Sequence, residues 1–239
     1  MRRRRQQLQY SLVCCKLLLL LLACACETSI KTDDAEVGEA LEKPVAIAPT
    51  DALQVDTAKS EVTWIATKIT GRHNGIFRLL NGELQLQENK ITGGTLVIDM
   101  TSLQATDKSI GVEGNRKLTA QLKSADFFDV ELYPMAVFEI ISVAPYDSTA
   151  TEKPGRRAYS DLKLKNPTHT ITGNLEIKGT VKSITFPAHI TSKPNELKAR
   201  ANFNIDRTKW GLTYLSDQSL GDKTIYSDVN IGFDIIAKP

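Results

Sequence analysis

The side chains in this sequence that could bind a metal or assist catalysis are few and widely spaced. The three histidines are His73, His169 and His189, at separations that no local metal-binding motif uses. No Gly-x-Ser-x-Gly motif, phosphate-binding loop or dinucleotide fingerprint occurs. The histidines stand among polar or strand-forming residues, so we expect surface or half-buried side chains. The sequence therefore predicts no catalytic residue, no metal site and no enzyme.

The cysteines, Cys14, Cys15, Cys24 and Cys26, all lie near the start of the chain. Because no cysteine follows Cys26, the long remainder can form neither a disulfide framework nor a thiolate metal site. The remainder also has no cysteine nucleophile. Any chemistry of the thiols therefore belongs to the N-terminal segment alone.

The first 23 residues have the order of a secretory signal peptide. Arginines at positions 2–5 precede an apolar run from Leu17 to Cys26, which Glu27 ends. A membrane-spanning helix needs about 20 apolar residues, and this run is only about half that length. A basic start, a short apolar centre and a small-residue exit predict a cleaved signal peptide over residues 1–23.

The end of the apolar run resembles the lipobox of bacterial lipoproteins. Leu21-Leu22-Ala23-Cys24 has the leucine and alanine of that pattern, and its cysteine would become the acylated first residue. Cys26 is the second choice, and ordinary secretion without a lipid is the alternative. The resemblance implies a lipid-anchored protein in the cell envelope that faces the periplasm.

A flexible acidic tether is expected over residues 24–52. Residues 27–54 carry seven acidic residues against Lys31 and Lys43, and they include two prolines and no aromatic residue. Such a composition buries too little apolar surface to offset its ordering entropy. We therefore expect a spacer between the membrane and a folded domain over residues 53–239.

The charge and composition of the chain exclude some partners. Hydrophobic residues make up 41% of the sequence and charged residues 24%, which is enough for an ordinary core. The net charge of +2 includes five basic residues and no acidic residue within positions 1–23, so the remainder carries −3. A mature protein with this balance has no electrostatic reason to bind nucleic acid.

The region after residue 53 reads as an all-β domain. Its strand candidates alternate in hydrophobicity, are rich in β-branched and aromatic residues, and are bounded by turn residues. Their spacing favours an antiparallel sandwich or barrel. We expect strands at Ser60–Lys68, Gly82–Leu86, Gly94–Met100, Met135–Val143, Thr170–Lys178, Thr180–Ile190, Lys198–Ile205 and Thr224–Ala237.

Two other segments stand out in this domain. Residues 115–125 place Leu118 and Leu122 four apart among polar residues, which predicts one amphipathic helix over a sheet end or barrel mouth. The glycines Gly111 and Gly114 are interpreted as a loop before that helix. Residues 146–168 are polar and contain Pro-Gly and Asn-Pro pairs, so we expect a long exposed hairpin loop.

The interior of such a barrel is open to two interpretations. A closed barrel of about eight strands is either filled by side chains or holds one small ligand. The low aromatic content, 6%, favours a cavity, but a packed core is an equal alternative on the sequence pattern alone.

Five blocks of the sequence resemble the YceI family of exported lipid-binding proteins. They are "VDTAKSEVTWIATK…GIF…NGELQL", "FFDVELYPMAVFEI", "ITGNLEIKGTVKSITFPAHI", "FNIDRTKWGL" and "GDKTIYSDVNIGFDIIA", in order over residues 53–239. The resemblance implies an antiparallel eight-stranded lipocalin-like β-barrel with a short helical insert. It also implies an apolar tunnel that binds a polyisoprenoid or an isoprenoid quinone. The sequence departs from the family at Lys59 and Lys68, where histidines are common.

The resemblance directs attention to the inward-facing apolar residues. The candidates for lining a tunnel, each also explained as plain core, are Val62, Trp64, Ala66, Phe77, Phe138, Ile140, Leu175, Ile177, Phe186, Phe203 and Ile205. Arg207, beside Asp206 at a strand end, is a candidate for contact with a lipid head group, because a guanidinium suits phosphate or quinone oxygen. The alternative for Arg207 is a structural salt bridge that braces the turn before Trp210.

Two functions follow as hypotheses. The first is an exported, lipid-anchored protein that binds or carries an isoprenoid lipid, with no other cofactor and with the membrane as its second partner. The second is a non-enzymatic envelope module with a packed barrel that binds a protein or glycan through loops such as residues 146–168. The sequence is compatible with a homodimer in either case.

Overall fold

The computed structural model describes residues 30–43, 49–149 and 162–239. The predicted signal peptide and the lipidation candidates Cys24 and Cys26 lie outside the described residues and stay predictions. Within the described ranges, no helix has the length and apolar character needed to cross a membrane.

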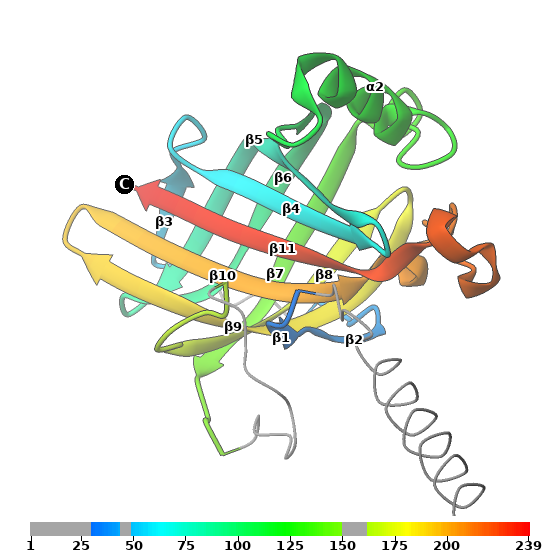
Figure 1. Cartoon of the computed structure of the whole chain (residues 1–239). Helices are drawn as coiled ribbons and strands as arrows, with labels where there is room; N and C mark the ends of the chain where they lie inside the picture. The colour runs from blue at the N-terminus through cyan, green and yellow to red at the C-terminus, as the bar shows by residue number, and fades with distance from the viewer. Residues whose placement is uncertain (1–29, 44–48, 150–161) are drawn as a thin grey trace, which may run out of the picture.

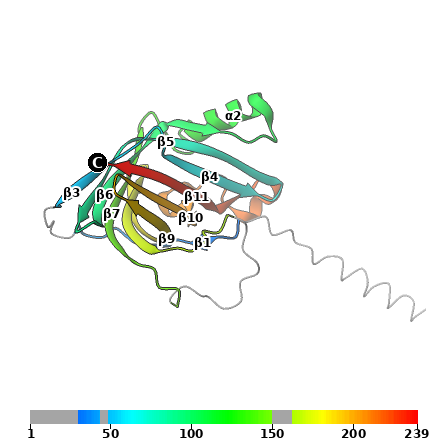
Figure 2. The same ribbon diagram turned by 90° about the vertical axis from the view of Figure 1, so that its left-hand side faces the viewer.

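In the part of the chain that the structure describes, eight antiparallel strands close into a barrel (Figure 1; Figure 2). Each strand pairs with the next along the chain, and the last pairs with the first, so the predicted fold class is confirmed. The strands are β4 (Glu61–Lys68), β5 (Gly71–Gln87), β6 (Lys90–Ala105), β7 (Met135–Pro145), β8 (His169–Ile177), β9 (Thr180–Lys193), β10 (Glu196–Asp206) and β11 (Ile225–Lys238). A further strand, β3 (Asp51–Val55), pairs with the far ends of β5 and β11.

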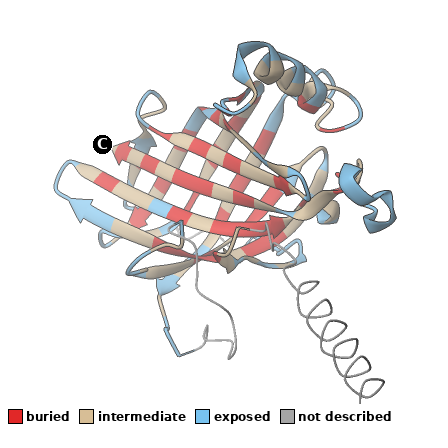
Figure 3. Cartoon of the chain, in the orientation of Figure 1, coloured by how far each residue is buried: buried red, intermediate tan, exposed pale blue. Residues whose placement is uncertain are grey.

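Alternation of side chains places the core inside the barrel, because successive residues of a strand point to opposite faces. Figure 3 shows buried residues alternating with less buried ones along the strands. On β4, for example, Val62 and Trp64 are buried, whereas Thr63 and Ile65 are only partly covered. The period-two pattern therefore predicted both the strands and their inner face.

One helix among the described residues, α2 (Gly111–Lys123), lies over one end of the barrel (Figure 1). It begins earlier than predicted, because Gly111 and Gly114 belong to its first turns instead of to a preceding loop. Leu122 is buried and Leu118 packs against the core, so the expected apolar stripe faces the barrel. The short helices η2 (Arg207–Trp210) and η3 (Gln218–Lys223) join β10 to β11. We call the barrel end bounded by α2, the β4–β5 turn and η3 the mouth.

The prediction of a flexible tether over residues 24–52 is wrong for the part of that segment that the structure describes. The strand β1 (Asp33–Asp34) pairs in parallel with β10, and β2 (Glu36–Glu39) pairs in antiparallel fashion with β9. Next to β2, the backbone of Leu41 exchanges two hydrogen bonds of 2.9 Å with the side chain of Asn174. Residues 24–29 and 44–48 lie outside the described residues.

The physical reason for this order is the split between β9 and β10. These two strands pair with each other only over Ala188–Lys193 and Glu196–Ala201, and beyond that point β1 and β2 take up the open edges. A polar segment with little apolar surface can be ordered in this way because backbone pairing is supported by buried side-chain contacts, such as the hydrogen bond of 3.0 Å from Thr32 to Asn204. The predicted hairpin loop does connect β7 to β8, although residues 150–161 lie outside the described residues.

Candidate ligand-binding site

The middle of the barrel is filled by four phenylalanines. Phe186 and Phe203 are stacked with ring centroids 4.1 Å apart, and Phe138 and Phe233 lie 5.7 Å and 6.1 Å from the Phe186 ring. We call these four residues the phenylalanine cluster. Aromatic packing of this kind contributes about 0.5–1.5 kcal/mol per pair beyond simple burial. The cluster therefore makes the centre of the barrel a packed core.

A cavity of about 350 Å³ lies at the mouth, between the phenylalanine cluster and α2. Its volume is at the lower end of the range for small-ligand pockets, about 300–1,000 Å³. The helix supplies one wall and the barrel supplies the other. Most of the wall is apolar, and its apolar members include Trp64, Ala66, Leu118, Leu122, Phe127 and Phe128. We call this space the mouth cavity.

A second cavity, of about 30 Å³, lies on the other side of the phenylalanine cluster. Phe138, Phe186 and Phe233 form part of its wall. Inward positions of β10 and the first residue of η2 show how the two spaces are arranged. Ala201 lines the small cavity and Arg207 lines the mouth cavity, whereas Phe203, between them, is fully buried and lines neither. Phe203 and Ile205, which is also buried and lines neither cavity, are thus two of the side chains that fill the interior between the cavities.

The predicted lining residues are all buried or half-buried, but they lie in different places. Trp64 and Ala66 line the mouth cavity, and Phe138, Ile140 and Phe186 line the small cavity. Val62, Phe77, Leu175, Phe203 and Ile205 are buried in the surrounding core, and Ile177 packs against it. Ligand contact by any of them stays a prediction, and the geometry favours Trp64 and Ala66.

Trp64 fits closely against Gly75 on the neighbouring strand β5. A Cβ atom added to Gly75 on β5 would lie 2.5 Å from the Trp64 ring, so only glycine leaves room for the indole there. The indole Nε1 is buried and has no hydrogen-bond acceptor among the described residues. The second tryptophan, Trp210, differs because its Nε1 donates to the carbonyl oxygen of Leu175 at 2.9 Å.

The sequence reasoning missed Phe127, Phe128 and His73 as residues around the mouth cavity. Phe128 packs edge-on against Phe77 at 5.9 Å, and Phe127 packs against Tyr214 at 5.0 Å. The two adjacent phenylalanines directly after an amphipathic helix were the available signal. Their position next to the predicted helix indicates that they complete its apolar face.

Arg207 lies in the wall of the mouth cavity and is only 5% exposed. Its guanidinium donates to the backbone carbonyl oxygens of Leu212, Tyr214 (2.9 Å), Ile225 (3.0 Å) and Tyr226 (3.3 Å). Burial lowers the pKa of the guanidinium, and the negative charge of Asp206 partly offsets this effect. Four of its five N–H groups are therefore committed to the loop after η2 and to the start of β11.

The structural alternative for Arg207 was a salt bridge with Asp206, and the observed contacts are different. The Asp206 carboxylate accepts hydrogen bonds from the Thr208 backbone N–H at 3.0 Å and from its hydroxyl at 2.6 Å, which caps η2. The turn before Trp210 is braced by guanidinium-to-carbonyl bonds. A head-group contact by Arg207 would have to use its single remaining N–H group.

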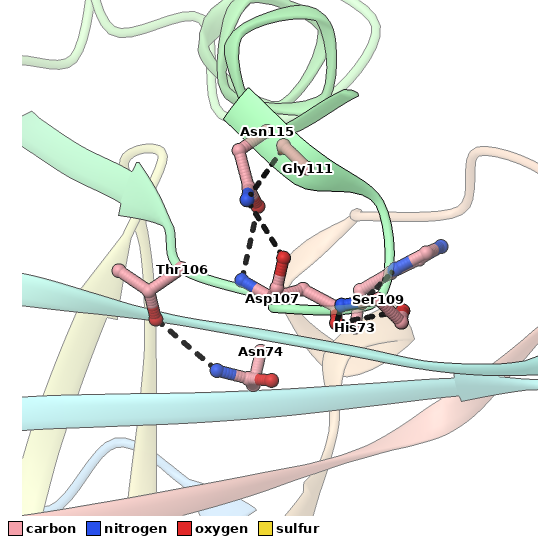
Figure 4. Close-up of polar contacts among 7 residues, drawn as sticks. All are labelled: His73, Asn74, Thr106, Asp107, Ser109, Gly111 and Asn115. Carbon is pink, nitrogen blue, oxygen red and sulfur yellow. Dashed lines mark hydrogen bonds and ion pairs between the residues drawn. The ribbon is translucent and has the colours of Figure 1, made fainter. Parts of the chain in front are cut away.

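His73 and Asp107 form a hydrogen-bonded pair at the rim of the mouth (Figure 4). The His73 Nδ1 lies 2.7 Å from Asp107 Oδ2, and the other carboxylate oxygen accepts bonds from the backbone and hydroxyl of Ser109 at 2.8 Å and 2.7 Å. Asn115 on α2 fixes the loop by bonding to the Asp107 backbone on both its N–H and its carbonyl. His73 is half-buried, as predicted for the histidines.

These bonds lower the pKa of Asp107 to about 2, chiefly through the Ser109 backbone N–H and then through His73 and the Ser109 hydroxyl. A carboxyl group whose pKa is lower in the folded state stabilises the fold at pH values above its pKa in the unfolded chain, which is near 4. This stabilisation is lost as the pH falls towards 2. The shift corresponds to about 2 kcal/mol. The loop that joins β6 to α2 therefore depends on an ionised Asp107.

We expect Asp107→Asn to lower the free energy of unfolding by about 2 kcal/mol at pH 6 and by much less at pH 2.5. Urea unfolding at the two pH values measures both differences. Asp126→Asn, at an exposed position after α2, is the matched control and should change little at either pH. An Asp107→Asn effect of equal size at both pH values would contradict the assignment.

A closed antiparallel barrel with an apolar cavity under a short helix places the protein in the lipocalin-like class. A family model described as the YceI-like domain matches residues 53–237. The chain therefore belongs to the YceI-like family, as the sequence blocks indicated.

Solved structures agree on the fold. BcnA of Burkholderia cenocepacia is 20% identical and superposes with a TM-score of 0.57, covering 77% of this chain and 99% of its own. A polyisoprenoid-binding domain from Saccharophagus degradans is 15% identical with a TM-score of 0.54, covering 78% of this chain and 97% of its own. A search of curated proteins gave no match.

Proposed function

We propose that this protein is an exported, lipid-anchored binding protein that takes up an isoprenoid-type chain in the mouth cavity. The observation that carries the proposal is the apolar cavity of about 350 Å³ between α2 and the barrel. Membership of the YceI-like family and likeness to a polyisoprenoid-binding domain support an isoprenoid as the ligand. The proposal needs no covalent step and no catalytic residue.

The physical basis of binding is transfer of an apolar chain out of water. Each methylene exposed to water costs roughly 0.8 kcal/mol, so a long isoprenoid is almost insoluble. In a bilayer the isoprenoid chain already avoids this cost. The protein must therefore offer the isoprenoid chain contacts that are as favourable as those in the membrane. The net preference over the membrane is therefore small, which suits exchange or carriage more than storage.

The volume of the mouth cavity limits how much of a ligand it encloses. A cavity at the lower end of the small-ligand range holds a short chain or one end of a longer chain. Deeper entry meets the packed core, which includes Phe203 and the rest of the phenylalanine cluster. We infer that a short isoprenoid fits the resting structure and that a long one requires the phenylalanine cluster to move.

Anchoring belongs to the same proposal. Acylation of Cys24, or of Cys26, after export would tether the barrel to a membrane of the cell envelope on the periplasmic side. Such a tether keeps the barrel close to a membrane that contains its ligand, so exchange needs only short diffusion. Mass spectrometry of the mature N-terminus tests this part, because an acylated Cys24 or Cys26 supports it and an unmodified N-terminus contradicts it.

We expect Ala66→Phe to fill the mouth cavity and to lower the affinity for an isoprenoid alcohol at least tenfold, because the added ring occupies the space of the ligand. Ile65→Phe is the matched control, since its side chain lies on the opposite face of the same strand. Titration with farnesol, followed by the fluorescence of Trp64 in the cavity wall, measures the affinity.

Two outcomes would contradict the proposal. If both variants bind farnesol like the unmodified protein, the mouth cavity is not the binding site. The second outcome is that the unmodified protein binds no isoprenoid and that native mass spectrometry of protein from membrane-containing cells shows no lipid. The alternative hypothesis, an envelope module with a packed barrel, would then be favoured. In that case shortening of residues 146–168 should abolish capture of a protein or glycan partner.

A further inference from the structure

We propose that a polar groove beside the mouth cavity binds the head group of the ligand, and that this head group is an anionic oxygen group, a phosphate or a carboxylate. The ligand class is then a single-chain anionic amphiphile. This inference rests on the proposed function, because it assumes that the mouth cavity takes the chain. It goes further by naming the chemistry of the head group and the residues that select it.

The groove lies where the β4–β5 turn meets the loop between β6 and α2. It is an open space of about 670 Å³, and its walls come from Lys68, residues 70–74 and residues 106–110. Figure 4 shows how the two segments are held together. Asn74 donates to the Thr106 hydroxyl at 3.1 Å, and the Thr106 backbone N–H donates to the Asn74 carbonyl at 2.9 Å.

The groove and the mouth cavity share part of their walls. Lys68 and His73 line both spaces, so the end of the apolar cavity is also the start of the polar groove. A chain that fills the cavity from the mouth would leave its head group at these two residues. This arrangement, an apolar space continuous with a polar one, matches the shape of an amphiphile.

The groove has an excess of positive charge. Lys68, Arg72 and Lys108 line it, and Asp107 is the single carboxylate among its described lining residues. The Asp107 oxygens are already occupied by His73 and Ser109, which reduces their repulsion of an anion. On the cavity side, Asp222 and Lys223 add one charge of each sign. The local field therefore favours an anion over a cation or a neutral group.

The kinds of donor in the groove also fit an oxyanion. Arg72 is exposed and presents a planar fork that matches the oxygens of phosphate or carboxylate, and Lys68 and Lys108 add point charges. His73 commits Nδ1 to Asp107, so its second ring nitrogen, on the other side of the ring, is left as a hydrogen-bonding atom at the boundary of the two spaces. Arg207, by contrast, has little capacity left for a head group.

The test uses probes with one chain and different head groups. Dodecanol, dodecanoic acid, dodecyl phosphate and dodecyltrimethylammonium are titrated into the full chain by calorimetry, and inorganic phosphate is titrated alone. We expect the two anionic probes to bind about tenfold more tightly than dodecanol, as two or three exposed ion contacts would give. The trimethylammonium probe should bind more weakly than dodecanol. The anionic preference should fall as the salt concentration rises.

A pair of charge-matched variants locates the effect. Arg72→Gln with Lys108→Gln should remove the anionic preference and leave the affinity for dodecanol unchanged. Lys90→Gln with Lys193→Gln removes the same charge from the other ends of β6 and β9, and it should retain the preference. If both double variants lose the preference for anionic probes equally, the preference is a general effect of net charge. That result would overturn the inference.

The outcomes also separate this inference from the proposed function. Failure of the unmodified protein to bind dodecanol or any other probe contradicts the function and the inference together. Binding of dodecanol with no preference for the anionic probes keeps the function and overturns only the inference. If inorganic phosphate binds as tightly as dodecyl phosphate, the groove is a site for free anions. That result would overturn the inference that the ligand is an anionic amphiphile.

Discussion

Replacing Arg207 by alanine is expected to lower the free energy of unfolding by about 3–5 kcal/mol, because it leaves several buried carbonyl groups without a donor. The guanidinium donates to four backbone carbonyls, two in the loop after η2 and two at the start of β11, and no shorter side chain reaches all of them. Urea unfolding, followed by circular dichroism, measures the change. Arg207→Lys should recover only part of the loss, since an ammonium group lacks the forked geometry.

The matched control is Arg200→Ala on β10, the strand that directly precedes Arg207. Arg200 is exposed and lies 3.2 Å from the exposed Asp234 carboxylate, so its removal should cost less than about 1 kcal/mol. If Arg207→Ala is as stable as Arg200→Ala but no longer binds anionic amphiphiles, the structural role is wrong. Arg207 would then be the head-group contact that the sequence made a candidate.

Replacing Phe203 by alanine is expected to have two large effects, one on stability and one on the chain length of the preferred ligand. The free energy of unfolding should fall by about 3–5 kcal/mol, as for other buried phenylalanines. Because Phe203 lies in the core between the two cavities, its loss should also leave a void that extends the small cavity towards the mouth cavity. The preferred isoprenoid should therefore become longer, with geranylgeraniol gaining affinity relative to farnesol.

Phe128→Ala is the control for this change. Phe128 lines the mouth cavity and is only half-buried, so its loss widens the cavity without joining it to the small one. The ratio of geranylgeraniol to farnesol affinity should stay close to that of the unmodified protein. A ratio that shifts equally in both variants would show that cavity width, not the barrier at Phe203, sets the chain length. If Phe203→Ala does not fold, Phe203→Leu tests the same ratio with a smaller opening.

Local sequence was a good guide to the strands and a poor guide to the contents of the barrel. The period-two pattern predicted the inward face of β4, where Val62 and Trp64 are buried. The low aromatic content suggested an open middle, but four of the seven phenylalanines converge there from four different strands. Amino-acid composition gives the number of phenylalanines but not their positions in the fold, so it could not predict the packed centre of the barrel.

Contacts between distant segments explain the other differences. The partners of Arg207 are carbonyl groups whose positions depend on the path of the chain after β10, which no local pattern encodes. The order in residues 33–39 depends on edges of β9 and β10 that come from the far end of the sequence. His73 is paired at the mouth because Asp107 approaches it from the loop between β6 and α2. Each of these features required the tertiary structure.

The closure of the barrel has a consequence for how the chain folds. Asp33 pairs with Phe203, and Val62 pairs with Phe233, so the wall is completed by segments from opposite ends of the sequence. Pairings of such high contact order form slowly, since the loop entropy is lost before the contact is gained. During synthesis, β4 and β10 present open edges until β11 has emerged, and open edges invite aggregation. A chain cut before Ile225 should therefore depend on chaperones to stay unaggregated, whatever the quality of its remaining core.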